Sequence, residues 1–369
     1  MQTSLLKKIL LYMLCISLLV SVCGCGKSAE KQSLETGSGQ EEMTDDSSQI
    51  FTMGTVFTVR VIAQENARDA LLAAEEVLNS SDRLLSWRRE GSAADLFNKS
   101  HQADVSEIKD LIETSLQISR DSSGAFDMSI LPLSQVWQFD KMEEEDFDPA
   151  DMEVPAPEKI AEARSRVDYT KLKFDPDSGV LSSEDPEIAI ELGAIGKGYA
   201  IDQALAVIKE SGAKGALISA GSSIGLFGTK EDGNFKVALR DPRGGISDYM
   251  GILEVTDCSI STSGDYERYF EKDGIRYHHI LDPSTGYPAD SGLMQVTVIG
   301  PSGAVCDALS TACFVLGLDE GMKLADQYNV LAIFVDKEKN IWYNNSDVLD
   351  ILEIVSKEYT MHEYNQKAE

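Results

Sequence analysis

Short apolar runs of strand length recur through the second half of the chain, and their spacing limits the folds that the sequence can form. They occupy residues 172–174, 188–192, 215–219, 235–239, 251–255, 277–281, 294–299, 330–335 and 340–343, after an earlier run at 51–61. Helical periodicity separates only some of them, at 66–85, 105–120, 199–211, 304–316 and 319–328. A parallel sheet needs a crossover between each pair of strands, whereas antiparallel strands need only a turn. We therefore predict an α+β fold with mostly antiparallel sheets and packed helices, rather than a doubly wound parallel sheet.

The first 24 residues have the features of a bacterial lipoprotein signal. Lys7 and Lys8 precede an apolar run at 9–22, which is shorter than the roughly 20 residues that cross a bilayer as a helix. Gly24 stands directly before Cys25, as a small residue does before a lipidated cysteine. We expect residues 1–24 to be removed and Cys25 to carry the lipid, such as palmitate, at the extracytoplasmic face of the cell membrane. An uncleaved anchor helix is the alternative.

The remainder of the chain divides by composition into a tether, one large domain and a tail. Residues 25–48 contain almost no large apolar side chains, so they cannot bury a core and are predicted to be a disordered tether. No internal repeat and no Pro/Gly-rich break interrupts the sequence that follows. We therefore predict a single domain at 49–345, followed by a C-terminal helix and tail at 346–369.

The charge of the chain restricts its ligands. The formal net charge is −29, and loss of Lys7 and Lys8 with the signal would make it −31. A surface this acidic excludes nucleic acid as a partner, because the phosphate backbone would be repelled. A phosphate-ester ligand would need a metal cation or a local cluster of basic side chains and backbone N–H groups to offset the same repulsion.

A glycine-rich segment, ELGAIGKGYAID at 191–202, follows the apolar run at 188–192 and precedes a predicted helix. Such a turn lets the backbone approach a ligand, and a helix N-terminus offers free N–H groups to phosphate. Lys197 would add a positive charge. The segment matches neither the Walker A pattern nor GxGxxG. From spacing alone, a turn carrying a solvated lysine and a phosphate site are equally acceptable interpretations.

Asp307 and Thr311 lie four residues apart in the predicted helix at 304–316, so they share one face of it. A carboxylate and a hydroxyl are ligands that suit a hard cation such as Mg²⁺. The alternative is a solvent-facing Asp with a Thr packed on the preceding turn, which is common in ordinary helices.

His279 and Asp282 lie where a predicted strand ends in a turn rich in Pro and Gly. Histidine and aspartate in this position can serve as a general base or hold a ligand. A structural histidine beside an aspartate that caps the turn is the equally acceptable alternative.

Seven segments, taken in order, carry a wider pattern. They are 53–55 (MGT), 85–98 (from LSW to Asn98), 123–127 (SGAFD), 192–199 (LGAIGKGY), 262–266 (TSGDY), 279–286 (HILDPSTG) and 307–311 (DALST). Together they resemble the ApbE family of FAD:protein FMN transferases, over nearly all of residues 50–345. The fold that this resemblance implies is a single T-fold-like α+β domain.

The resemblance also implies roles for individual residues. Mg²⁺ would be held by the backbone carbonyl of Ala194 and by Asp307 and Thr311. Contacts to FAD would fall on Met53, Trp87, Ala125, Phe126, Asp127, Glu191, Lys197 and Leu281. The family usually has Asp where this chain has Glu191, and Gly-Gly-Asp or Gly-Gly-Asn where this chain has Gly221-Ser222-Ser223.

The activity implied is Mg-dependent transfer of FMN from FAD to a Thr or Ser hydroxyl of another protein, with release of AMP. His279 is expected to accept the hydroxyl proton, with Asp282 as its orienter or as the base itself. The acceptor would be a flavoprotein subunit of a membrane redox complex or an extracellular reductase. The alternatives are an Mg-dependent FAD pyrophosphatase, which gives FMN and AMP, and a non-catalytic FAD-binding lipoprotein.

Overall fold

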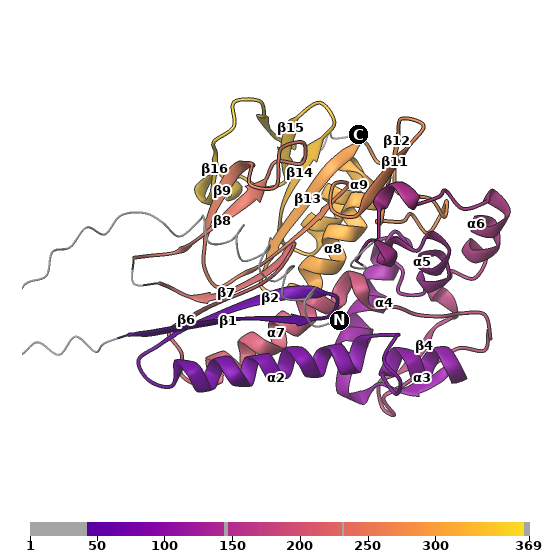
Figure 1. The fold of residues 1–369 in the computed structure, drawn as a ribbon, viewed down its shortest axis with the longest axis horizontal. Coiled ribbons are helices and arrows are strands. Elements are labelled where there is room, and N and C mark those ends of the chain that lie inside the picture. Colours follow the sequence, from indigo (N-terminus) through magenta and orange to yellow (C-terminus); the bar gives the residue numbers. More distant parts are fainter. Residues whose placement is uncertain (1–42, 144–146, 231, 365–369) are drawn as a thin grey trace, which may run out of the picture. The chain divides into compact units, whose positions relative to one another are not determined.

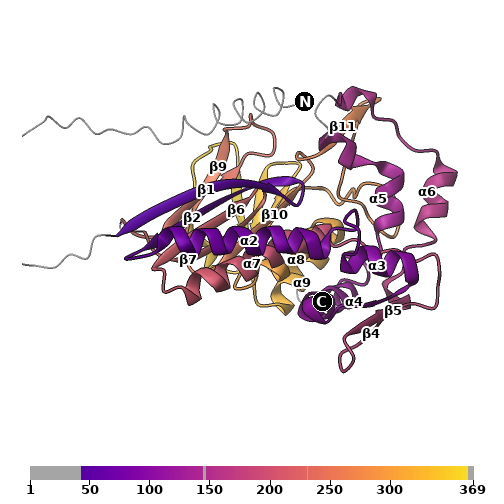
Figure 2. The same ribbon diagram turned by 60° about the horizontal axis from the view of Figure 1, so that its bottom comes forward.

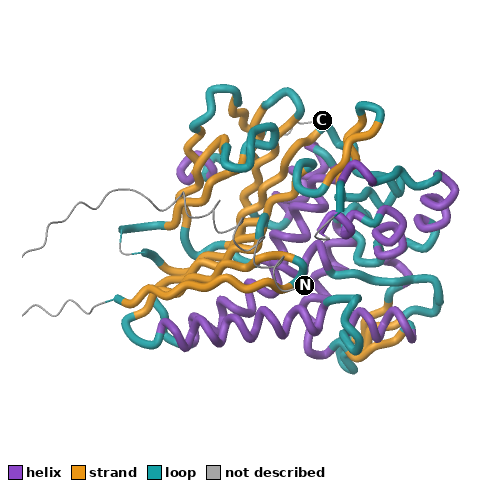
Figure 3. The backbone as a smooth tube through the Cα atoms, viewed as in Figure 1, coloured by secondary structure: helices purple, strands orange, loops and turns teal. Residues whose placement is uncertain are grey.

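The computed structural model describes residues 43–143, 147–230 and 232–364 (Figures 1 and 3). The predicted signal, Cys25 and most of the predicted tether lie outside these residues. Among the helices of the described part, none is both long enough and apolar enough to span a bilayer.

A nine-stranded sheet forms the centre of the described domain (Figure 1). Neighbouring strands are antiparallel, except that β15 and β17 are parallel. The predicted α+β fold with mostly antiparallel sheets is therefore confirmed. In spatial order the strands are β1 (Thr44–Thr52), β2 (Thr55–Ala63), β6 (Gly215–Ala220), β7 (Ser223–Gly228), β10 (Ser259–Gly264), β13 (Leu293–Gly300), β14 (Leu331–Asp336), β15 (Asn340–Tyr343) and β17 (Thr360–Glu363).

Each face of this sheet is covered by a different layer. Helices α2 (Ala67–Leu85), α7 (Gly193–Glu210) and α8 (Gly303–Leu316) lie together along one face, as Figure 2 shows. A small sheet of β8 (Phe235–Arg240), β9 (Tyr249–Val255) and β16 (Leu352–Ile354) packs against the other. Successive residues of β2 serve the two layers in turn: Val61 packs with the helices and Ile62 with the small sheet.

A third group of elements extends from one end of the sheet (Figures 1 and 2). The hairpin β11–β12 and helices α5 and α6 of this group share an aromatic core that includes Trp137, Phe270 and Tyr277. The group contains α3 (Ala93–Ser100), α4 (Lys109–Asp121), α5 (Leu131–Trp137), α6 (Pro157–Arg164), the sheet of β3 (Gln102–Asp104), β4 (Lys173–Asp175) and β5 (Val180–Ser182), and the hairpin of β11 (Tyr269–Lys272) and β12 (Ile275–His278). Helix α9 (Leu318–Gln327) follows α8.

The N-terminal strand prediction at 51–61 needs a correction. The segment is a hairpin, in which β1 begins at Thr44 and turns into β2 at Met53 and Gly54. Both turn residues have positive φ, 51° for Met53 and 71° for Gly54. The polar strand TDDSSQIFT pairs at the edge of the sheet, where water reaches one side, so it needs no continuous apolar pattern. Ordered structure thus starts earlier than residue 49.

The C-terminal prediction, a helix and tail at 346–369, also differs from the structure. Within the described residues only α10 (Val348–Ile351) is helical, and β16 and β17 follow it. β16 pairs with β9, and β17 completes the edge of the nine-stranded sheet. Backbone pairing with existing edges stabilises this segment, and that pairing leaves little trace in local periodicity.

Helices α7 and α8 touch backbone to backbone at Gly198 and Gly303. A Cβ atom built on Gly198 would lie 2.0 Å from the carbonyl oxygen of Gly303, and one on Gly303 would lie 2.5 Å from that of Gly198. Asp202, one turn later in α7, accepts the N–H groups of Gly303 at 2.7 Å and Ala304 at 3.1 Å, and so caps α8. The two helices are locked together at their N-terminal ends.

Replacing Gly198 with Ala should therefore separate α7 from α8. We expect Gly198→Ala to lower the free energy of unfolding by about 1–3 kcal/mol, the usual cost of overpacking. Gly193→Ala is the matched control, because its Cβ would meet nothing within 4 Å and Ala is favoured over Gly in a helix by about 1 kcal/mol. Urea unfolding of both variants measures the difference, and equal midpoints would contradict the contact.

Candidate active site

Asp307 is the centre of the polar cluster between α7, α8 and the sheet. Its side chain projects from the second turn of α8 and is only 5% exposed. Its Oδ1 accepts the hydroxyls of Ser223 at 3.1 Å and Ser261 at 2.9 Å, and its Oδ2 accepts the backbone N–H of Gly198 at 3.0 Å. The ammonium of Lys197 lies 3.7 Å from Oδ2. These donors stabilise a buried negative charge.

Thr311 lies one turn after Asp307 on the same face of α8, as the spacing predicts. Its Oγ1 is 3.3 Å from the hydroxyl of Ser263 and 3.4 Å from the carbonyl oxygen of Asp307. The Ser263 hydroxyl also lies 2.9 Å from that of Ser310. Strand β10 thus supplies hydroxyl groups to both of the predicted metal ligands on α8.

The glycine-rich segment at 191–202 is helix rather than turn over most of its length. α7 begins at Gly193, six residues before the predicted start, and residues 188–192 form no strand. Ala194 therefore lies in the first turn of α7, four residues before Gly198. An N–H at this position normally donates to the carbonyl four residues back, and that of Gly198 reaches Asp307. The Ala194 carbonyl consequently lies at the end of α7 that faces the carboxylate.

These groups suit a magnesium ion in their chemistry. The carboxylate of Asp307, the hydroxyl of Thr311 and the carbonyl of Ala194 are all hard oxygen donors. Mg²⁺ is commonly held by one or two carboxylates, with water and substrate phosphates as its other ligands. No group of three or more His, Cys, Asp and Glu side chains suited to a metal occurs in the described residues. The donor set thus fits Mg²⁺ bound together with a phosphate ligand, and does not resemble a zinc site.

Met53 brings the β1–β2 turn to the start of α7. A Cβ on Gly196 would lie 3.3 Å from Cε of Met53 and 3.4 Å from Cδ1 of Leu85. Trp87, two residues after Leu85, is half-buried against the core, and the Arg88 guanidinium lies 4.4 Å from its ring centroid. Three of the segments singled out in the sequence therefore meet around the first turn of α7.

His279 follows directly after β12, and its backbone N–H donates to Arg268 at 3.0 Å. Its Nδ1 is buried and has no hydrogen-bond partner in the described part of the chain. Burial, and then the positive charges of Arg268, His278 and Lys197, hold the pKa of His279 well below its ordinary value. A neutral imidazole with a free nitrogen can accept a proton at neutral pH.

Asp282 organises its own turn. Its Oδ1 accepts the N–H of Ser284 at 2.8 Å, and its carbonyl accepts those of Thr285 and Gly286. One carboxylate oxygen is thus used in the turn-capping role that was the alternative interpretation of this residue. Leu281, beside it, is buried and bridges to Pro288.

Glu191 is half-buried just before α7. Its Oε1 accepts the hydroxyl of Ser134 at 2.8 Å, and its N–H donates to Met128. Burial raises the pKa of Glu191, while the Ser134 hydrogen bond and then the charges of Arg268 and Arg88 oppose the rise. A carboxyl group whose pKa is raised by burial is typical of a functional site.

Asp127 has a structural part in the 123–127 segment. Its carboxylate accepts the N–H and hydroxyl of Ser129 and the N–H of Tyr169. Burial nevertheless raises the pKa of Asp127. Phe126 is buried, and Ala125 is half-exposed on the turn. Of the three, Ala125 is thus the most accessible to a ligand.

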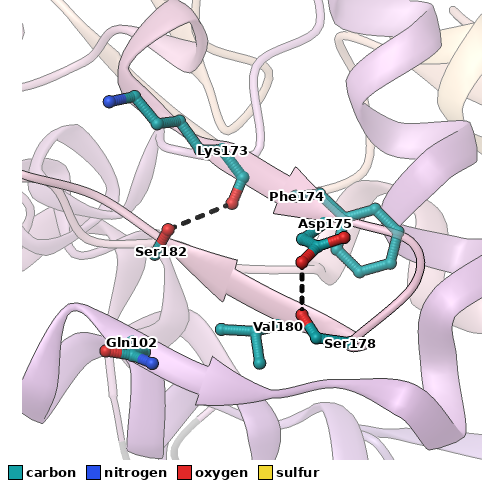
Figure 4. Close-up of a pocket in the computed structure, with 7 residues that line it drawn as sticks. All are labelled: Gln102, Lys173, Phe174, Asp175, Ser178, Val180 and Ser182. Atoms are coloured by element: carbon teal, nitrogen blue, oxygen red, sulfur yellow. Dashed lines mark hydrogen bonds between the residues drawn. The ribbon is translucent and has the colours of Figure 1, made fainter.

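A shallow pocket on the small β3–β5–β4 sheet is separate from all of these residues (Figure 4). It has a volume of 330 Å³ and contains none of the predicted site residues. The figure shows Ser178 bonded to Asp175 and Ser182 to the backbone of Lys173, so its polar groups serve the hairpin itself. Its lining residues are Gln102, Lys173, Phe174, Asp175, Ser178, Val180 and Ser182.

Ser261 and Ser134 are site residues that the sequence analysis missed, and Ser223 was named there only as part of a departure from the family's usual sequence. Ser223 is the first residue of β7, and Ser261 lies within β10. The apolar pattern predicted neither strand. The alternation of hydroxyl residues in SISTSG at 259–264 is the one signal that could have identified Ser261.

Comparison with known proteins places this chain among flavin transferases. The model of the ApbE family matches residues 53–334. An FAD:protein FMN transferase of Treponema pallidum is 32% identical over 311 residues, which cover 78% of this chain and 84% of the relative. The ApbE protein of Thermotoga maritima superposes with a TM-score of 0.72 at 30% identity, over 83% of this chain and 99% of that one. The apo flavinyl transferase ApbE of Pseudomonas stutzeri gives a TM-score of 0.68 at 30% identity, over 80% and 92%.

Proposed function

Because this chain belongs to the ApbE family and is a flavin transferase that uses FAD, we propose that it moves FMN onto a Thr or Ser hydroxyl of an acceptor protein in an Mg²⁺-dependent reaction. The proposed Mg²⁺ dependence is supported by the polar cluster at the start of α7. There the N–H of Gly198 lies 3.0 Å and the ammonium of Lys197 3.7 Å from Oδ2 of Asp307.

We assign the metal to Asp307, Thr311 and the carbonyl of Ala194. Bound there, Mg²⁺ would neutralise charge on the pyrophosphate of FAD and so ease attack at phosphorus. Lys197 would add a second positive charge beside the same phosphates. On a chain with a net charge of −29, this local cation pair would be essential for binding a dianionic ligand.

In the proposed reaction the acceptor hydroxyl attacks the flavin-side phosphorus of FAD. The new O–P bond forms as the bond to the bridging oxygen breaks, and AMP leaves with that electron pair. His279, whose pKa is held well below its ordinary value and whose imidazole is therefore neutral at pH 7, takes the hydroxyl proton. Asp282 keeps one carboxylate oxygen outside the Ser284 contact, with which it can orient the acceptor or the imidazole.

The acceptor is proposed to be a flavoprotein subunit of a membrane redox complex or a flavin-carrying extracellular reductase. The enzyme would reach it from the extracytoplasmic face of the membrane, held there by lipid on Cys25. Both proposals rest on the sequence, since residues 1–42 are outside the described part.

The reaction itself can be tested with purified enzyme, FAD, MgCl₂ and an acceptor that carries a Ser/Thr-Gly-Ala-Thr-like motif. We expect in-gel flavin fluorescence on the acceptor, abolished by EDTA. Asp307→Asn should lower transfer by about 100-fold or more, because even an outer-shell partner of a metal is worth about 10- to 100-fold. Asp177→Asn, an exposed acid of the β4–β5 turn, is the control. Free FMN alone would indicate a pyrophosphatase, and intact FAD a carrier.

His279→Ala should lower kcat for transfer by about 10²- to 10⁴-fold, the usual value of a general base, with FAD binding near normal. Wild-type kcat/KM should rise as His279 loses its proton and stay level above that point. Because the pKa of His279 is held well below 6.5, this acid limb should lie below pH 6.5. Stopped-flow rates across pH, with FAD affinity measured separately, provide the readout, and retained transfer in the variant would exclude His279 as the base.

Cys25→Ala should release the protein from the membrane. In a bacterial host fed labelled palmitate, the wild-type chain should carry the label and sediment with membranes. The variant should carry none, because a thiol is required for lipidation. Label persisting in the variant would refute anchoring at this residue.

A further inference from the structure

We propose that Ser223 and Ser261 make Asp307 a ligand through one oxygen only, and thereby select Mg²⁺ over Ca²⁺. This inference rests on the proposed metal-dependent function. It assigns the two serines as positioning residues, which act on the metal through Asp307 and do not touch it.

The two serines lie opposite each other on neighbouring strands. Ser223 on β7 and Ser261 on β10 are direct cross-strand partners in the antiparallel register, so their side chains project from the same face of the sheet. Each is only 1% exposed. A buried hydroxyl is costly unless it is hydrogen-bonded, and both hydroxyls are directed at the same carboxylate oxygen of Asp307.

Their contacts occupy Oδ1 of Asp307. The Ser223 and Ser261 hydroxyls lie 3.1 and 2.9 Å from Oδ1 and 3.0 Å from each other, which closes a triangle of oxygens. An ionised carboxylate oxygen can only accept. A cation that bound Oδ1 would have to displace one of these hydroxyls and leave it buried without its partner.

The other oxygen, Oδ2, is the one presented to a cation. Among the described residues it accepts a hydrogen bond of 3.0 Å from the N–H of Gly198, and the Lys197 ammonium lies 3.7 Å away. A positive charge therefore already faces Oδ2. The end of α7 that carries Ala194 and Lys197 is on this side of the carboxylate, and the serines of the sheet are on the other.

One-oxygen coordination discriminates between the two hard cations. Mg²⁺ requires near-ideal octahedral geometry with short bonds, so it takes one oxygen from a carboxylate together with water or phosphate oxygens. Ca²⁺ takes 6–8 oxygens at longer distances and often uses both oxygens of a carboxylate (roughly 2.3–2.6 Å). Fixing Oδ1 on two serines removes the bidentate mode and so lowers the affinity for Ca²⁺ in particular.

Calorimetric titration of the FAD-free full chain with MgCl₂, and separately with CaCl₂, tests this selectivity without using transfer activity. We expect the wild type to prefer Mg²⁺. Ser223→Ala and Ser261→Ala should each weaken Mg²⁺ binding by about 10- to 100-fold, the usual effect of losing an outer-shell partner. The same changes should leave Ca²⁺ binding equal or tighter, so that the Mg²⁺/Ca²⁺ affinity ratio falls by at least about tenfold.

Two further variants separate positioning from folding. Ser261→Thr keeps the hydroxyl and should retain the wild-type ratio. Ser115→Ala removes an equally buried hydroxyl that donates to Leu111 within α4, and should leave the affinities for both metals unchanged. Thermal unfolding identifies a variant that is not folded. If either Ser223→Ala or Ser261→Ala is unfolded, the Mg²⁺/Ca²⁺ affinity ratio of the other variant tests the inference.

The inference is overturned if the serine variants weaken both metals in the same proportion, or if the ratio does not change. It is also overturned if the wild type shows no preference for Mg²⁺. The flavin-transfer assay judges the proposed function independently, because transfer that requires a divalent metal but does not discriminate between Mg²⁺ and Ca²⁺ would retain the function and refute the role of the serines.

Discussion

Two helices meet backbone to backbone at Gly198 and Gly303, and the arrangement of the site depends on this contact. No side chain fits between them, since a Cβ on Gly198 would lie 2.0 Å from the Gly303 carbonyl oxygen. The close approach lets Asp202 of α7 cap α8, and lets Asp307 of α8 accept the N–H of Gly198. The predicted metal ligands of both helices are brought together by the same contact that packs the helices on the sheet.

The second constraint is charge. The chain carries a net charge of −29, yet some of its acids are not on the surface. Asp307 and Asp127 are buried, and Glu191 is half-buried. Burial raises the pKa of Glu191 and of Asp127, so keeping either ionised at neutral pH reduces the stability of the fold. The negative charge of a buried carboxylate must be stabilised locally by hydroxyls, backbone N–H groups and a few cations. The basic groups Lys197 and Arg268 lie near these acids and near His279, which they help to keep neutral.

Local periodicity was sufficient for the longer helices and for most of the apolar strands, but it missed the short helices α3, α5 and α6 and predicted a strand at 188–192 that does not form. The helix at 66–85 matches α2, which has an apolar face with a 3.6-residue period, and that at 304–316 matches α8, which is apolar and buried over most of its surface. Periodicity was insufficient for β1, β7, β10 and β17, in which polar or small residues interrupt the apolar pattern. Such strands are stabilised by pairing with neighbours distant in the sequence, as β10 pairs with β13, and no local pattern encodes that. The start of α7 was misplaced for a related reason: three glycines favour a turn, but packing on α8 makes them helical.

The sequence by itself determined that Asp307 and Thr311 share a helix face, because the four-residue spacing of an α-helix requires it. It also determined the chain's resemblance to a family, and with it the class of reaction. Only the tertiary structure decided which groups surround Asp307. Ser223 and Ser261 precede it by 84 and 46 residues, and their positions follow from the register of β7 on β10. The division of the carboxylate into one oxygen held by the sheet and one facing α7 arises from sheet pairing and helix packing together, which act between segments that no local pattern connects.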